Sequence, residues 1–166
     1  MGIGETRMQR SIYFQGESSL IAVVAFSVQV AADLGLSTQT YEAFAKSQLD
    51  YVLGNGPNGT PLIDGKQASL VIGHGELYPH SPYHTPSNCP PYPEKCGWDN
   101  FHSPDPNYWL LYGALVGGPR TLTDVFIQER SLYVQSDVTL DFNCGFQGLL
   151  AAFYYNDFLK ELDVTP

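Results

Sequence analysis

The segment from Ser18 to Leu34 constrains the fold most, because its sequence leaves almost no polar face on a helix. It reads SSLIAVVAFSVQVAADL and predicts a helix that is apolar nearly all round and is ended by Gly35. Such a helix is stable only when neighbouring elements cover most of its sides. The chain has 166 residues and offers about five helices, few for this purpose. The pattern therefore indicates an incomplete domain.

Hydrophobic periodicity, together with Gly and Pro, predicts the remaining elements and an all-α fold with long loops. Residues 55–107 are dense in Gly, Pro, Asn and Ser. Ordinary connections are a handful of residues, so a loop of this length is typical of a segment that carries function or lines a site. The predicted elements are a helix capped by Ser37 and ended by Gly54, a β-like run from Ala68 to Ile72, short helices over Tyr108–Val116 and Asp124–Val134, and a last helix from about Asp137 to Leu162.

The charge pattern argues against nucleic acid as a partner and against a membrane span. The net charge is -9 and the eight Lys and Arg form no cluster, whereas phosphate backbones need a basic surface. The apolar run Leu20–Phe26 is followed closely by polar residues and falls short of the roughly 20 residues that a span requires. Met1–Ser19 lacks the apolar core of a signal peptide. The protein is therefore cytosolic, or its beginning lies elsewhere.

The cysteines favour an oxidising compartment. Cys89 and Cys96 lie seven residues apart in a Pro-rich loop, a spacing that can close a small disulfide. Cys144 falls in an apolar helical segment and is expected to be a buried free thiol. Asn58-Gly59-Thr60 is a sequon, which predicts glycosylation of Asn58 in a secreted protein. The chain has no CxxC-type metal pattern, and we expect neither a metal nor a cofactor.

Four segments of the chain carry, in order, a resemblance to a known family. They read AKSQLDYVLG, SLVIGHGELYPHSPYH, CGWDNFHSPDPNYWLLYGALVGGP and YVQSDVTLDFNCGFQGLLAA, and they lie between Ala45 and Ala152. They resemble glycoside hydrolase family 9, whose members include many endo-β-1,4-glucanases. The resemblance implies part of an (α/α)6 barrel, in which six outer helices surround six inner ones.

Domains of this family are far longer than the present chain, which resembles only their C-terminal third. We therefore interpret residues 1–166 as a partial family 9 domain, whose N-terminal helices come from another chain or from an unassigned part of the same one. The family's N-terminal part carries an Asp-Ala-Gly-Asp type segment, whose aspartates activate the hydrolytic water. No stretch of this chain matches that segment.

The first active-site signature of the family is altered in this chain. Family 9 enzymes invert, which needs a protonated acid and a carboxylate base on opposite faces of the sugar. Their Pro-His-x-Arg segment binds the sugar, and the matching residues here are Pro82-Tyr83-His84-Thr85. Tyr83 and Thr85 cannot supply the planar fork of a guanidinium. Tyr83 and His84 remain candidates for substrate binding, although His84 matches only the variable position and can equally be an ordinary loop histidine.

The second signature is altered as well. Its supporting aspartate corresponds to Gln128, which cannot ionise, and its acidic glutamate corresponds to Asp137. Asp137 is one methylene shorter, which draws its oxygens back by roughly 1–1.5 Å. A displacement of about 1 Å can cost on the order of 10²-fold in rate. Phe142, a further candidate for substrate binding, stands where these enzymes usually have Tyr, while Asn143 matches and Cys144 departs.

Asp137 also has a structural interpretation. An Asp directly before the sequence VTLDF can cap the last helix by accepting backbone N–H groups of its first turn. Asp141, one turn later, is expected to pack against a neighbouring loop. Asp137 is therefore either a degenerate acid or a helix cap.

The loop CGWDNFHSPDPNYW keeps the family form better than either signature. Trp98 and Asp99 can present an aromatic plate and hydrogen-bonding groups to a glycan. Alternatively, Trp98 pins the loop to the barrel and Asp99 satisfies backbone donors, with Pro104 and Pro106 stiffening the scaffold. Tyr108, Trp109 and Tyr112 are expected in the core or at the rim.

Together these features lead to one hypothesis and two alternatives. The hypothesis is a non-hydrolytic family 9-like domain that serves as a structural or glycan-binding part of an extracellular protein, with polysaccharide or oligosaccharide as a partner and its signal peptide outside this chain. The first alternative is an active endo-β-1,4-glucanase with Asp137 as general acid and a base from the missing N-terminal part. The second is an assembly subunit that uses the toroid only for protein contacts.

Overall fold

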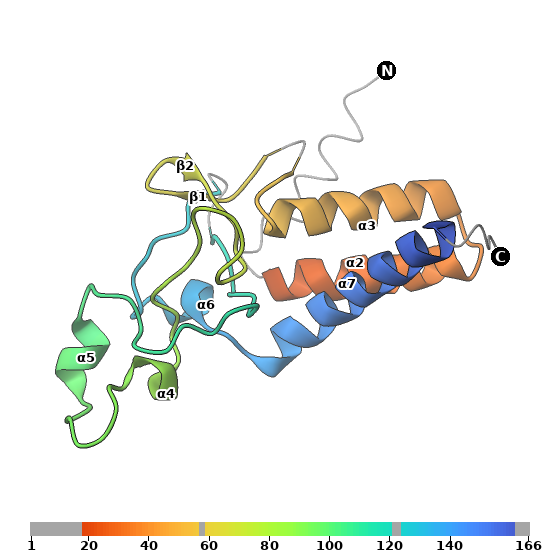
Figure 1. Ribbon diagram of the computed structural model, residues 1–166. Coiled ribbons are helices and arrows are strands. Elements are labelled where there is room, and N and C mark those ends of the chain that lie inside the picture. Colours follow the sequence, from red (N-terminus) through yellow and green to blue (C-terminus); the bar gives the residue numbers. More distant parts are fainter. Residues whose placement is uncertain (1–17, 57–58, 121–123, 162–166) are drawn as a thin grey trace.

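The computed structural model describes residues 18–56, 59–120 and 124–161, which form two layers (Figure 1). One is a helix layer of α2 (Ser18–Asp33), α3 (Thr38–Val52) and α7 (Leu140–Glu161). The other is a loop layer, here the described residues between 54 and 139. It contains the helical turns α4 (Thr85–Asn88), α5 (Trp98–His102) and α6 (Tyr133–Ser136), and a two-stranded antiparallel sheet of β1 (Leu62–Ile63) and β2 (Lys66–Gln67). The expected all-α fold with long loops is confirmed.

Helix α2 packs against both α3 and α7, as its nearly all-apolar sequence requires. Its buried apolar residues are alanines, and α7 lies close to it: a methyl group added at Gly145 would lie 2.8 Å from the Cα of Val23. Phe146 and Leu149 of α7 are buried beside this contact. The core continues into the loop layer through residues that include Val52, Ile63, Leu70, Ile72, Leu115 and Val116. No helix in the described part of the chain is long and apolar enough to cross a bilayer.

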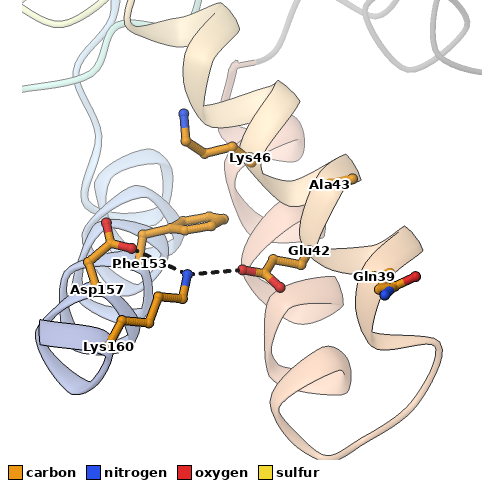
Figure 2. A pocket seen from close by; sticks show the side chains of 7 residues that line it. All are labelled: Gln39, Glu42, Ala43, Lys46, Phe153, Asp157 and Lys160. Carbon is orange, nitrogen blue, oxygen red and sulfur yellow. Dashed lines mark hydrogen bonds and ion pairs between the residues drawn. The ribbon is translucent and has the colours of Figure 1, made fainter. Parts of the chain in front are cut away.

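An ion-pair seam joins the ends of α3 and α7 (Figure 2). Lys160 Nζ lies 3.7 Å from Glu42 Oε1 and 3.5 Å from Asp157 Oδ1, beside a hollow of 370 Å³ that Phe153 also lines. All three charged side chains are substantially exposed, and exposed pairs contribute about 0–1 kcal/mol. The apolar packing of α2, rather than this seam, therefore holds the helix layer together.

Ser37 does not act as the predicted cap of α3. It occupies the N-cap position, but its backbone is left-handed (φ 43°) and its side chain makes no capping hydrogen bond. A capping side chain reaches the N–H groups of the first turn from an extended backbone. The tight turn through Gly35, whose φ is 83°, leads the chain into α3 in a different conformation.

The two short helices predicted over Tyr108–Val116 and Asp124–Val134 are wrong. The first segment is extended and pairs with the run Ala68–Ile72: Ile72 N donates to Ala114 O at 2.9 Å, and Val71 bridges Leu115. The β-like run therefore exists as paired backbone but not as a regular strand. The second segment pairs with β1, since Phe126 N donates to Leu62 O at 2.8 Å, and only α6 is helical near its end.

The start of α7 also differs from the prediction. The helix begins at Leu140, so Asp137 does not cap it and is instead the C-cap residue of α6. Asn143 N bonds to the carbonyl of Thr139 at 3.2 Å, which places the first turn of α7 after Asp137. Cys144 is a free, exposed thiol and Asp141 is exposed, because α7 turns Phe146 and Leu149 toward the core and these two residues away from it. The expectations of a buried Cys144 and a packed Asp141 are therefore wrong.

Arg130 is a buried clamp on the loop layer. Its Nη1 donates to the carbonyls of Asn100, Phe101 and Ser103 at 3.0, 3.0 and 2.9 Å, and its Nη2 donates to Asp105 O at 3.0 Å. Its Nε donates to Asn107 Oδ1 at 2.8 Å. Burial lowers the pKa of Arg130 from its ordinary value, and the negative charge of Asp105 acts in the opposite direction. One side chain thus satisfies the carbonyls at the end of α5 and in the loop that follows.

We predict that Gly145→Ala destabilises the protein by about 1–3 kcal/mol. The added methyl group meets the backbone of Val23 and would force α2 and α7 apart. The matched control is Gly148→Ala, whose nearest neighbours are ring atoms of Phe26 that can move aside. Because Ala gains up to about 1 kcal/mol of helix propensity over Gly, the control should stay within about 1 kcal/mol of the original. Urea unfolding measures both, and equal effects would contradict the close contact.

We predict that Arg130→Met lowers the free energy of unfolding by about 3 kcal/mol or more. The change leaves the carbonyls of Phe101 and Ser103 and the Oδ1 of Asn107 without their donor, and each unsatisfied buried group costs about 1–3 kcal/mol. The control is Arg120→Met, which removes the same charge from an exposed position and should change stability by less than about 0.5 kcal/mol. Urea unfolding of both variants checks this, and a similar loss in each would show that charge alone matters.

Candidate functional site

The structure brings the two signature segments side by side. Tyr83 N donates to Ser136 O at 2.9 Å, and Tyr83 and Asp137 form a parallel bridge. The backbone of Asp137 is fixed further, because Gly117 N donates to its carbonyl at 3.0 Å. Residues that lie more than fifty positions apart in the sequence thus meet at one place, at the edge of the loop layer.

The carboxylate of Asp137 is bonded locally. Its Oδ1 accepts a hydrogen bond from Val138 N at 2.8 Å, and the residue is half-buried. The side chain of Phe142 and the whole of Asn58 lie outside the described residues.

Gln128 is bonded on both sides by one backbone segment. Its Oε1 accepts from His80 N and its Nε2 donates to Tyr78 O, each at 3.1 Å. A carboxylate can only accept, so an ionised Asp at this position could not make both bonds. Burial lowers the pKa of the neighbouring His80, the charge of Arg130 lowers it further, and Asp64 opposes both. His80 is therefore neutral at pH 7.

His84 caps the helical turn α4. Its backbone is extended, and its Nδ1 accepts from Ser87 N at 3.2 Å. The adjacent Asn107 donates from Nδ2 to Pro82 O at 2.9 Å and to Ser87 Oγ at 2.7 Å. Because Asn107 also accepts from Arg130, the clamp extends to the segment that carries Tyr83 and His84.

A hollow of 380 Å³ opens between α4 and α5. Cys89 and Cys96 are disulfide-bonded, as predicted, and close the loop that leads into α5. Arg130 contributes to the lining, but its guanidinium is occupied by carbonyls. No carboxylate lines the hollow in the described part of the chain, and Asp137 is not among its lining residues. These are Tyr83, His84, Thr85, Asn88, Cys96, Gly97, Trp98, Phe101 and Arg130.

Aromatic rings form a continuous row along this hollow, here called the aromatic row: Tyr133, Tyr83, Phe101, Trp98 and His102. Tyr83 meets Phe101 edge-on with ring centroids 6.0 Å apart, and Phe101 meets Trp98 edge-on at 5.6 Å. Trp98 stacks on His102 at 5.9 Å with an interplanar angle of 21°. Trp98 is 76% exposed, so the structure favours a presented ring over one that pins the loop.

The other predicted residues lie around the hollow without lining it. Asp99 is exposed on α5. Tyr108, Trp109 and Tyr112 are exposed, which places them at the rim rather than in the core, and Trp109 Nε1 donates to Cys89 O at 3.1 Å. Among the described residues, no group of three or more His, Cys, Asp or Glu could hold a metal ion.

The sequence analysis missed Arg130 and Asn107, which position the site. Arg130 lies inside the second signature, between Gln128 and Tyr133, and it is one of eight basic residues in an acidic chain. Arg130 stands between Glu129 and Ser131, so the local sequence gives no signal that its guanidinium is buried. Its partners could not be read from the sequence, because they lie 23–30 residues away.

Relatives with known names are endoglucanases. The chain is 33% identical over 137 residues to the endoglucanase of Dictyostelium discoideum, covering 82% of this chain and 17% of that protein. It is 35% identical over 116 residues to endoglucanase 22 of Arabidopsis thaliana, covering 66% of this chain and 22% of that protein. The chain thus spans less than a quarter of the length of these two relatives.

Solved cellulase structures share the fold. The endoglucanase of the termite Nasutitermes takasagoensis matches with a TM-score of 0.74 and 44% identity, covering 84% of this chain and 30% of that one. The cellulase Cel9M of C. cellulolyticum in complex with cellobiose matches with a TM-score of 0.67 and 31% identity, covering 84% and 28%. These folds are (α/α)6 barrels, as the resemblance implied. The model of glycosyl hydrolase family 9 matches residues 4–150, and the chain belongs to this family.

Proposed function

We propose that this chain is part of a family 9 domain that binds β-1,4-linked glycan without hydrolysing it. The observation that carries the proposal is the lining of the hollow: aromatic rings, polar groups and the guanidinium of Arg130, which is occupied by carbonyls, without a carboxylate among the described residues. Inversion needs an acid and a base on opposite sides of the bond. Asp137 lies beside Tyr83 but outside the hollow, with one oxygen bonded to Val138 N.

Three further positions support the loss of hydrolysis. The family resemblance implies His, Arg and Asp where this chain has Tyr83, Thr85 and Gln128. Gln128 is built into the loop layer through two backbone bonds, and Thr85 is an exposed hydroxyl without a charge. With these residues the chain keeps the site's framework and lacks the histidine, arginine and aspartate that the family resemblance implies at these three positions.

We further propose that residues 1–166 complete their barrel with a more N-terminal part of a family 9 domain. Large apolar side chains lie exposed on the helix layer, among them Val23 and Val30 of α2 and Leu140, Tyr154 and Phe158 of α7. Such a surface is typical of an interface. The disulfide between Cys89 and Cys96 supports an extracellular location.

A working endoglucanase is the alternative. It is favoured by the pairing of Tyr83 with Asp137, which keeps a carboxyl group at the position of the family acid. In that case Asp137 is a shortened general acid, and the base comes from the part of the barrel outside this chain.

We predict that a chimera distinguishes the two functions. In it, this chain replaces the matching part of the termite endoglucanase, which supplies the rest of the barrel. On soluble β-1,4-glucan we expect no turnover above background. Restoring the family residues through Tyr83→His, Thr85→Arg, Gln128→Asp and Asp137→Glu should raise turnover by at least about 10²-fold, the factor that a displacement of about 1 Å costs.

Two controls accompany this assay. Circular dichroism and thermal melting of both chimeras show that each is folded, so that inactivity reflects chemistry. The second control is Asp137→Ala in the unrestored chimera, which should change nothing. Turnover in the unrestored chimera that Asp137→Ala abolishes would establish the endoglucanase and end the proposal.

A further inference from the structure

We propose that Trp98, with its neighbour His102, is a stacking subsite for a neutral pyranose ring at the mouth of the hollow. The subsite rests on the proposed glycan binding and deepens it, because it names the side chains that hold the sugar. It lies on α5, whereas Asp137 lies beyond α6, so binding there does not depend on the acid position.

Trp98 presents an aromatic face that the protein holds still. Phe101 supports the indole edge-on and His102 stacks on it with offset rings, while 76% of the residue stays exposed. An aromatic side chain that stays in water does not contribute the roughly 1.5–3 kcal/mol of stabilising free energy that its burial would give. A large aromatic ring held in one place at the mouth of a hollow is typical of a binding surface.

The Arg130 clamp fixes the backbone beneath this ring. The carbonyls of Asn100 and Phe101, in the turn that carries Trp98, accept from Arg130 Nη1. At the other end of the turn, Gly97 N donates to Asn100 Oδ1 at 2.9 Å. A subsite that is ordered before binding loses little conformational freedom when the ligand arrives. Arg130 is thus a positioning residue for Trp98.

The lining selects a neutral ligand with hydroxyl groups. Arg130 is 3% exposed and its N–H groups donate to carbonyls, so they are not available to bind an anion. The remaining polar groups at the hollow include the exposed Thr85 hydroxyl and the half-exposed His84 ring. An apolar plate with neutral hydrogen-bonding groups beside it matches a pyranose, whose C–H face is apolar and whose rim carries hydroxyls. The volume of 380 Å³ falls within the range of small-molecule sites.

The first test is calorimetric binding of cellohexaose to the 166-residue chain and to two variants. Trp98→Ala should weaken binding at least about 10-fold, as the loss of a central aromatic anchor does. The control is Tyr92→Ala, which removes a 96% exposed ring from the disulfide loop that precedes α5, outside the hollow, and should leave the affinity unchanged. Trp98→Phe, which keeps a ring, should recover most of the affinity.

The second test observes the ring directly. The chain has two tryptophans, so Trp109→Phe leaves Trp98 as the only indole fluorophore. Acrylamide should quench this variant strongly, and cellohexaose should protect it. In Arg130→Lys, which keeps the charge but cannot supply the same fork of donors, protection should weaken even where circular dichroism shows a folded chain.

The outcomes separate the subsite from the proposed function. If cellohexaose binds but Trp98→Ala binds equally well, the subsite is wrong and glycan binding elsewhere stands. If Trp98 is shielded from acrylamide without any sugar, another part of the protein covers it and the subsite is also wrong. If neither the unaltered chain nor the chimera that completes its barrel binds cellohexaose, both the subsite and the proposed glycan binding fail.

Discussion

The loop layer depends on one constraint: its buried backbone groups need hydrogen-bond partners although it contains almost no regular secondary structure. Helices and sheets satisfy such groups internally, whereas irregular backbone must find other partners. Here backbone pairs such as Ile72 N with Ala114 O satisfy part of them, and buried or half-buried side chains supply further partners. Arg130 bonds four carbonyls, Gln128 bonds the backbone of residues 78 and 80, and Asn143 accepts from Leu115 N at 2.8 Å and donates to Leu115 O at 3.2 Å. These amide and guanidinium groups provide hydrogen bonds that regular helices and sheets would otherwise provide.

The residues that hold the hollow in shape are different from the residues at the acid position. Arg130 and Asn107 tie α5 to the segment around Pro82 without using any group that must gain or lose a proton during catalysis. The acid position belongs to a different connection, the pairing of Tyr83 with Asp137. Substitutions at the second connection leave the first intact, so a chain can keep the ordered hollow and Trp98 while it gives up hydrolysis.

The sequence predicts the helix layer well and the loop layer poorly, for a physical reason. Helices α2, α3 and α7 are set by local hydrophobic patterns, and glycines mark the ends of α2 and α3, which a sequence displays directly. The segment Tyr108–Val116 has apolar residues that suit a helix equally well, yet it pairs with residues 70–72. Whether this segment forms a helix or an extended pair therefore depends on a partner some forty residues away. The hydrogen-bond partners of Arg130 are likewise distant in the sequence. The Cys89–Cys96 disulfide, by contrast, could be predicted because its spacing is local.

The hydrogen bonds of Gln128 indicate how the loop layer would respond to a carboxylate at this position. A carboxylate at this position would still accept from His80 N, but it would turn a second oxygen toward the carbonyl of Tyr78, which now accepts from the amide. An unsatisfied buried carbonyl costs about 1–3 kcal/mol. The new negative charge would also favour protonation of His80, which burial and Arg130 now keep neutral. Restoring the charge at position 128 therefore disturbs the neutral frame around it, whereas lengthening Asp137 alone leaves position 128 uncharged.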